Sequence, residues 1–176
     1  MTEPDDRAST PAARPPSRQV GALLAWLGIV FVAAAIGGIG SASAPDFYAA
    51  LDRPAWAPPA GVFGPVWSVL YTLMAVSIWL VWRERSRIGN AAHLPAGLFL
   101  TQLAANALWS WVFFVWHDGA LALTNILALD ALVIATVLAF RRARPLAAAL
   151  LLPYLAWIAF ATALTFSAWQ RNPGLL

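Results

Sequence analysis

Aromatic and amide side chains recur at helical spacing in three apolar stretches of the chain. Residues three or four apart lie on one face of an α-helix, so each set forms a stripe. Stripes made mostly of rings are typical of a pocket for a large, flat, mainly apolar ligand, because ring faces stack on ring faces. The stripes are Phe63, Trp67 and Tyr71; Gln102, Asn106, Trp109 and Phe113; and Tyr154, Trp157, Ala161 and Thr165.

Several other kinds of chemistry lack the residues they need. Cysteine is absent, which excludes disulfides, thiolate catalysis and cysteine-bound metals. His93 and His117 flank an apolar stretch of membrane length, so they cannot share a metal ion. The sequence contains no nucleotide-binding glycine loop and no nucleophile elbow. We therefore expect no conventional hydrolase or transferase site, no metal, no required cofactor and no nucleic-acid partner.

Three polar residues lie inside apolar stretches, where an unpaired polar group is costly. For Gln102 a hydrogen bond between packed helices is the favoured interpretation, whereas Asn106, one turn from Trp109, fits a helix bridge or a cavity wall equally well. Asp130 lies halfway along its stretch. It is either a site of proton or ligand coupling, or a carboxyl kept neutral or hydrogen-bonded to a neighbouring helix, and we favour the second.

The elements that carry these residues are long and apolar. Hydrophobic residues make up 61% of the 176 residues and charged residues only 11%, which is not the composition of a soluble domain. Helices of twenty residues are about 30 Å long and match a bilayer core, whereas barrel strands would alternate apolar and polar residues. The sequence therefore predicts an all-α integral membrane protein, a bundle of five transmembrane helices at residues 20–39, 63–82, 95–116, 120–140 and 146–169.

Charge and proline set the ends of this domain and its orientation. Residues 1–19 combine proline with mixed charges and no apolar periodicity, so we expect a disordered tail before a membrane domain at residues 20–176. Nine arginines fall in the tail and after the second and fourth stretches, whereas only Arg53 and Arg171 fall on the opposite side. Arginine-rich loops stay cytoplasmic. We expect a bacterial inner-membrane protein with a cytoplasmic N-terminus and an external C-terminus.

The loop at residues 40–62 is the one long connection between the stretches. Pro54, Pro58 and Pro59 stiffen it and present Trp56 at low entropic cost. Such a loop could cap a cavity, or it could lie among the lipid headgroups, where tryptophan and tyrosine are enriched. Composition alone slightly favours the headgroup interpretation.

The sequence resembles one known family, over about two thirds of its length and in the same order. YAALDRPAWAPP at residues 48–59 with the stripe from Phe63, QLAANALW at 102–109 and PYLAWIAFATALT at 153–165 are similar to the TspO family of translocator proteins, also called peripheral benzodiazepine receptors. The resemblance implies a five-helix bundle, often a homodimer, that binds porphyrins, haem and in some members cholesterol. The ligand pocket it implies consists of Tyr48, Trp56, Pro58, Trp67, Tyr71, Asn106, Trp109, Trp157, Ala161 and Thr165.

Several functions remain open under this resemblance. The leading hypothesis is a membrane receptor or carrier for porphyrin-type tetrapyrroles such as protoporphyrin IX or haem, with a role in tetrapyrrole handling or stress. An enzyme-like alternative is light-dependent porphyrin degradation, which the resemblance implies for some bacterial members. Sterol binding or transport ranks lower, because the cholesterol-recognition pattern needs a tyrosine where Phe166 and Ser167 stand. Thr165 replaces a frequent asparagine of the family, and a subunit that only packs helices through small residues remains an alternative.

Overall fold

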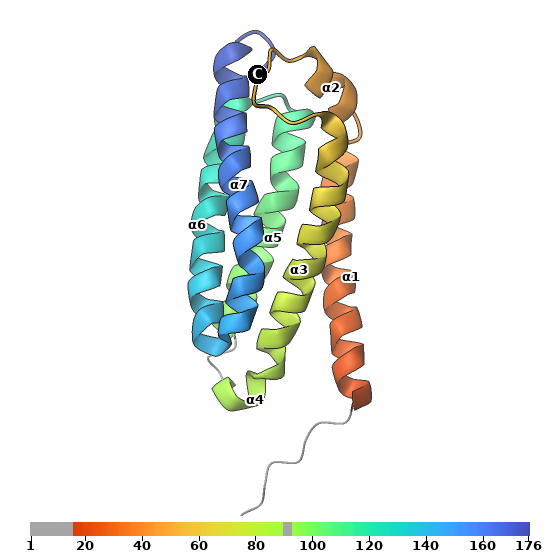
Figure 1. Cartoon of the computed structure of the whole chain (residues 1–176), viewed down its shortest axis with the longest axis vertical. Helices are drawn as coiled ribbons and strands as arrows, with labels where there is room; N and C mark the ends of the chain where they lie inside the picture. Colours follow the sequence, from red (N-terminus) through yellow and green to blue (C-terminus); the bar gives the residue numbers. More distant parts are fainter. Residues whose placement is uncertain (1–15, 90–92) are drawn as a thin grey trace, which may run out of the picture.

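Five long helices form the protein. The computed structural model describes residues 16–89 and 93–176, and no strand occurs in these two ranges. The long helices are α1 (Pro16–Gly40), α3 (Phe63–Arg83), α5 (His93–Phe114), α6 (Gly119–Ala143) and α7 (Pro145–Arg171), with short helices α2 (Ala44–Ala50), η1 (Ala60–Val62) and α4 (Arg85–Ile88) in the connections (Figure 1). All five long helices have the length and hydropathy to cross a membrane. The predicted five-helix bundle is confirmed.

Nine of the ten ends of the long helices differ from the predicted boundaries, by one to four residues, and two of these differences have a clear local cause. Helix α1 begins at Pro16, four residues before residue 20, because proline has no N–H to satisfy and its fixed φ suits the first turn of a helix. Helix α5 ends at Phe114, before residue 116, because His117 adopts a φ of +54° and turns the chain out of the helix. The predicted disordered tail falls mostly on residues 1–15, which lie outside the described residues.

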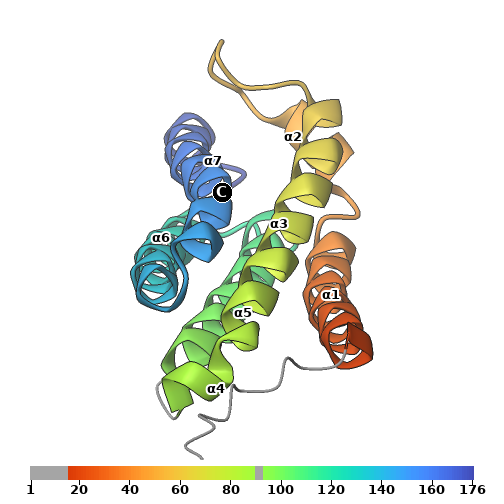
Figure 2. The ribbon, with the colours of Figure 1, turned by 60° about the horizontal axis from the view of Figure 1, so that its bottom comes forward.

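The helices form a closed ring. Going around the bundle, the neighbours in contact are α1 with α3, α3 with α7, α7 with α6, α6 with α5, and α5 with α1. The view toward the α4 end shows α6 and α7 on one side of α3 and α5, and α1 on the other (Figure 2). A ring of five helices can enclose a ligand site between them, as helix bundles commonly do.

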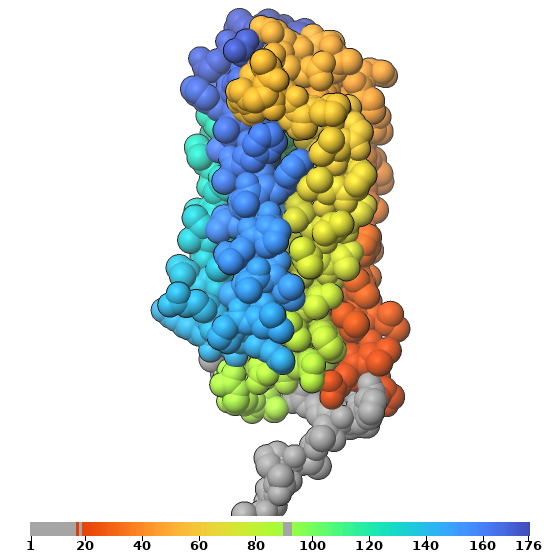
Figure 3. All heavy atoms as spheres, in the orientation of Figure 1, coloured from red at the N-terminus to blue at the C-terminus, as the bar shows by residue number. Residues whose placement is uncertain are grey.

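One end of the bundle is covered by the long loop. The loop, with α2 and η1, reaches across the end of the bundle from α1 and α3 toward α7, as the space-filling view shows (Figure 3). The C-terminus lies at this same end (Figure 1). We call this the loop end and the opposite end, where α4 lies, the α4 end.

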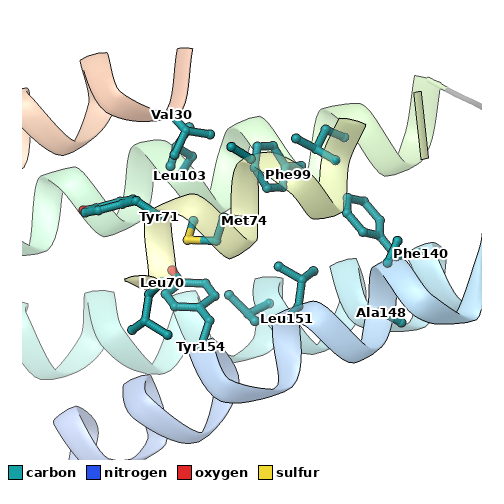
Figure 4. Close-up of a cluster of buried hydrophobic side chains, with 14 of the residues drawn as sticks. Val30, Leu70, Tyr71, Met74, Phe99, Leu103, Phe140, Ala148, Leu151 and Tyr154 are labelled. Carbon is teal, nitrogen blue, oxygen red and sulfur yellow. The ribbon is translucent and has the colours of Figure 1, made fainter. Parts of the chain in front are cut away.

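The half of the bundle near the α4 end is filled by its own side chains. Met74, Phe99, Phe140 and Leu151, from four different helices, are buried to within 1% exposure. Figure 4 shows these side chains side by side, with Tyr71 and Tyr154 among them. Because this half is packed, a ligand cavity inside the bundle has to lie above it, toward the loop end.

The outside of the bundle is apolar. Large aliphatic side chains of every long helix are exposed, for example Leu24, Val69 and Leu138. Helix α1 is the least covered, with 11% of its most apolar stretch buried. Contiguous apolar exposure of this kind is the surface expected of helices that face lipid.

Arginines gather at the α4 end. Arg83, Arg85, Arg87, Arg141, Arg142 and Arg144 lie there, at the ends of α3, α4, α6 and α7 or between these helices. Glu84 pairs with Arg87 at 3.0 Å and with Arg144 at 3.4 Å, and Arg87 also donates to the Ala143 carbonyl at 2.6 Å. These bonds tie the α3–α4 corner to the α6–α7 corner.

Candidate functional site

The loop folds over the bundle through its tyrosine. The Tyr48 hydroxyl, at the end of α2, donates to the Pro58 carbonyl at 2.9 Å, which closes the loop on itself. The Arg53 guanidinium lies 4.6 Å from the centre of the Tyr48 ring, a cation–π contact. Phe63 places its ring edge against the same tyrosine, with ring centres 5.4 Å apart. Tyr48 is only 7% exposed and therefore forms the centre of the loop's small core.

Asn172 holds the loop to the end of α7. Its side-chain oxygen accepts from the Asp52 backbone N–H at 2.8 Å, and its amide nitrogen donates to the Asp52 carbonyl at 3.0 Å. The same nitrogen donates to the Ala168 carbonyl at 2.8 Å. Arg171 adds an exposed ion pair with the Asp52 carboxylate at 3.6 Å. One amide thus satisfies both backbone groups of a loop residue, and we call this arrangement the Asn172 clasp.

A cavity of about 370 Å³ lies beneath the loop. This volume is within the range of small-molecule sites. All five long helices contribute to its walls, and Tyr48, Leu51 and Arg53 contribute from the loop. Arg53 is the one residue with a formal charge among those that line the cavity. The cavity is therefore an apolar chamber with a cation at the loop.

Eight of the residues that line the cavity are aromatic. Trp67 stacks on Tyr71 with ring centres 5.3 Å apart, and Trp109 stacks on Phe113 at 5.0 Å with an angle of 13° between the rings. Trp157 meets the edge of Phe63 at 6.0 Å. Rings already held by such pairs keep their faces in fixed directions, so they can stack on a flat ligand at little entropic cost.

The floor of the cavity is polar. Tyr71 donates to the Asn106 side-chain oxygen at 3.0 Å, the Asn106 amide donates to the Tyr154 hydroxyl at 2.9 Å, and Tyr154 donates to the Gln102 side-chain oxygen at 2.9 Å. Tyr71 and Asn106 line the cavity, whereas Gln102 and Tyr154 lie beneath it in the packed half. The expected interhelical bond of Gln102 is thus present, and Asn106 is both a bridge and a wall.

Eight of the ten residues in the predicted pocket line this cavity. They are Tyr48, Trp67, Tyr71, Asn106, Trp109, Trp157, Ala161 and Thr165. Trp56 and Pro58 are not among the lining residues. Trp56 is 51% exposed and packs its ring against Phe160, with ring centres 5.7 Å apart. Pro58 contributes its carbonyl oxygen, which accepts the hydrogen bond of the Tyr48 hydroxyl. The loop covers the cavity, as the first of its two interpretations predicted, and its position relative to the lipid headgroups stays a prediction.

Some lining residues were not predicted. Ala34, Gly37 and Gly38 of α1 line the cavity, although small residues in a membrane helix by themselves indicate only helix packing. A Cβ at Gly37 would lie 3.5 Å from Ala107 and Ser110 of α5, which is an ordinary van der Waals contact, so α1 and α5 pack closely here. Arg53 was noted only for topology, and nothing in its sequence context placed it over Tyr48.

Asp130 has a partner on the next helix. The Thr162 hydroxyl of α7 donates to one carboxyl oxygen of Asp130 at 2.7 Å, and the other oxygen is buried without a hydrogen-bond partner among the described residues. The structure therefore agrees with the interpretation in which Asp130 is hydrogen-bonded to a neighbouring helix. Asp130 does not line the cavity.

The described side chains offer no metal site. No group of three or more histidine, aspartate or glutamate side chains comes together in residues 16–89 and 93–176. The cavity offers stacking on its rings, ion pairing at Arg53, and hydrogen bonding at polar side chains that include Tyr71, Asn106 and Thr165. Trp109 also lines it, and its Nε1–H is buried without a partner among the described residues.

Comparison with known proteins agrees with the family resemblance. The model of the TspO/MBR family matches residues 25–170. The human protein named translocator protein is 42% identical over 128 residues, which cover 73% of this chain and 76% of the human one. The tryptophan-rich protein TspO of Archaeoglobus fulgidus is 38% identical over 130 residues, covering 74% and 82%. The protein CrtK of Rhodobacter capsulatus is 34% identical over 153 residues, covering 86% and 95%.

Proposed function

The chain belongs to the TspO/MBR family and is an integral membrane protein, and we propose from this premise that it is a receptor or carrier for porphyrin-type tetrapyrroles. The observation that carries the proposal is the aromatic cavity with one cation at its loop. A tetrapyrrole such as protoporphyrin IX is a flat aromatic macrocycle with carboxylates along one edge. Its ring suits the walls and its carboxylates suit Arg53.

The charge distribution favours a carboxylate ligand over a sterol. The walls contributed by Trp67, Trp109 and Trp157 would serve any large apolar molecule. Arg53, however, is anchored over Tyr48 and reaches the cavity, and a neutral sterol has no anionic group to form an ion pair with it. A porphyrin oriented with its carboxylates toward the loop would use both features.

The test is a titration of the purified protein with protoporphyrin IX and with its dimethyl ester, followed by quenching of tryptophan fluorescence. We expect saturable binding of both, with the free acid the tighter ligand. Arg53→Gln should weaken binding of the acid by about two- to fivefold, as for a partly exposed ion pair, and leave the ester unchanged.

The matched control is Arg142→Gln, because Arg142 is an exposed arginine at the α4 end. It should leave both affinities as in the parent. If Arg53→Gln weakens the binding of the acid and of the ester equally, Arg53 does not contact the carboxylates. If neither porphyrin binds the folded protein, the proposed function is wrong.

A light-dependent reaction is the second candidate. Three indole rings line the one cavity in which a porphyrin would be held, and tryptophan is the side chain best suited to give an electron to an excited pigment. Illumination of the complex should then change the absorption spectrum of the bound porphyrin. If the spectrum of the bound porphyrin is unchanged after illumination, the light-dependent reaction is excluded and only the receptor or carrier function is left.

A further inference from the structure

The polar floor of the cavity is one continuous hydrogen-bond chain through three helices. It runs from Tyr71 of α3 to Asn106 of α5, then to Tyr154 of α7, and back to Gln102 of α5. Only its outer end, at Tyr71 and Asn106, reaches the cavity. Its inner end is the Gln102 amide nitrogen, which is buried without a partner among the described residues, in a side chain only 1% exposed.

Each member of this chain can both donate and accept a hydrogen bond, because each is a hydroxyl or an amide. In the arrangement seen, the Tyr71 hydroxyl donates its hydrogen bond to Asn106, so toward a ligand it can only accept a hydrogen bond. The same atoms allow the opposite polarity. If both amides turn over, Gln102 donates to Tyr154, Tyr154 to Asn106, and Asn106 to Tyr71. The Tyr71 proton is then free to point at a ligand.

The two polarities contain the same three bonds with donor and acceptor exchanged. Their inner ends differ only in which half of the Gln102 amide lacks a partner, its nitrogen or its oxygen. Because the two arrangements are so closely matched, one additional hydrogen bond from a ligand is enough to decide between them.

We propose that Tyr71, Asn106, Tyr154 and Gln102 form a reversible hydrogen-bond chain that lets the cavity floor accept or donate a hydrogen bond. The ligand's polar group selects the polarity. The site would thus take flat aromatic molecules that present either an N–H or a carbonyl oxygen to Tyr71, while the carboxylates of a porphyrin would point to Arg53 at the loop. This inference deepens the proposed function and rests on the cavity being the ligand site.

Three tricyclic probes of the same size separate these cases. Carbazole presents an N–H donor, fluorenone presents a carbonyl acceptor, and fluorene presents neither. Binding to the purified full chain is measured by quenching of tryptophan fluorescence. For the parent protein we expect carbazole and fluorenone each to bind about two- to tenfold more tightly than fluorene, which is the net effect of one hydrogen bond. Tyr71→Phe should make all three probes bind alike.

Gln102→Leu tests whether polarity is set from the inner end. Without Gln102, the Tyr154 hydroxyl can donate its hydrogen bond only to Asn106. The hydrogen-bond chain is then held in the reversed polarity, in which Tyr71 is a donor toward the ligand. The affinity of fluorenone relative to carbazole should then rise by about two- to tenfold, with fluorene unchanged. Because the effect must pass through Tyr154, the same substitution made in a Tyr154→Phe background should leave this ratio unchanged.

A merely structural role for Gln102 predicts that all three affinities change together. That result in folded Gln102→Leu, or an equal change of the ratio in the Tyr154→Phe background, would overturn the inference. If Gln102→Leu does not fold, as judged by circular dichroism, Gln102→Met is measured in its place. Probe preferences that survive in Tyr71→Phe overturn the inference independently of either variant.

The porphyrin titration keeps this inference separate from the proposed function. If protoporphyrin IX fails to bind while the probes follow the expected pattern, the reversible hydrogen-bond chain is supported and the tetrapyrrole ligand is not. If protoporphyrin IX binds but the probes show no preference that depends on Tyr71, the inference fails and the proposed function stands.

Discussion

Trp157 is the residue whose loss should damage the cavity most directly. It lines the cavity from α7 and is held in place by Phe63 at 6.0 Å and Phe160 at 5.5 Å. Trp157→Ala removes a stacking wall, so protoporphyrin IX should bind at least about tenfold more weakly. The measurement is the fluorescence titration, made on protein with a parent-like circular dichroism spectrum.

Trp26 provides the matched control for this truncation. It lies in α1 against the edge of Phe99, with ring centres 6.0 Å apart, and does not line the cavity. Trp26→Ala should therefore leave porphyrin affinity nearly unchanged. If the two variants remain folded and lose affinity equally, the ligand is not in the cavity beneath the loop.

At the scale of elements, the loop depends on one amide at the end of α7. Asn172→Ala removes the two hydrogen bonds that connect this amide to the Asp52 backbone, at 2.8 and 3.0 Å. Each such bond contributes about 0.5–1.5 kcal/mol net, so the loop should open more often and bound porphyrin should dissociate roughly tenfold faster. Stopped-flow displacement of bound protoporphyrin IX measures this rate.

Arg171→Gln is the control for the Asn172 clasp. It removes only the exposed ion pair to Asp52 at 3.6 Å, a contact of small net energy. The dissociation rate should stay close to that of the parent. A folded Asn172→Ala variant that releases ligand at the parent rate would contradict a loop held by this residue.

The turn between α5 and α6 depends on a glycine for steric reasons. Asp118 caps α6 by accepting from the Leu121 N–H at 2.9 Å, and the next residue, Gly119, lies directly against the Trp169 ring of α7. A methyl group at Gly119 would overlap that ring. Gly119→Ala should therefore destabilise the protein by about 1–3 kcal/mol through overpacking.

Thermal unfolding in detergent tests this prediction against a second glycine. Gly97 lies on an exposed part of α5 with open space at its Cβ position, so Gly97→Ala should leave the unfolding midpoint unchanged or raise it slightly. A Gly119→Ala midpoint as high as that of Gly97→Ala would show that α6 and α7 can separate at this end without loss.

At the scale of the whole molecule, the bundle and most of the cavity could be predicted because they depend on local patterns. Span length and hydropathy identify the five helices, and helical spacing places Trp67, Trp109 and Trp157 on inward faces. Arg53 could not be placed, because its position depends on a loop fixed by Asn172, 120 residues beyond Asp52. Glycines of α1 were missed because small residues in a membrane helix equally indicate packing. The homodimer implied by the resemblance stays a prediction.

The orientation in the membrane is the last property that the fold helps to predict. Six arginines lie on α3, α4, α6 and α7 or between them at the α4 end, whereas Arg53 and Arg171 lie at the loop end. Arginines at helix ends can extend their charged groups to the membrane interface at either face. This tendency therefore does not explain why more arginines lie at the α4 end than at the loop end. Retention of arginine-rich loops on the cytoplasmic side does explain it. The cavity and its loop would then open toward the outside.

Reporter fusions decide the orientation. A reporter that is active only outside the cytoplasm should be active when fused after Leu176 and when inserted in the turn at Asp118, since both sites lie at the loop end. Inserted between Arg83 and Arg87, at the α4 end, it should be inactive. The two loop-end fusions act as mutual controls, because the fold requires them to agree whatever the orientation. Active reporter only at the α4 end would reverse the orientation and place the cavity toward the cytoplasm, while disagreement between the two loop-end fusions would contradict the odd number of spans.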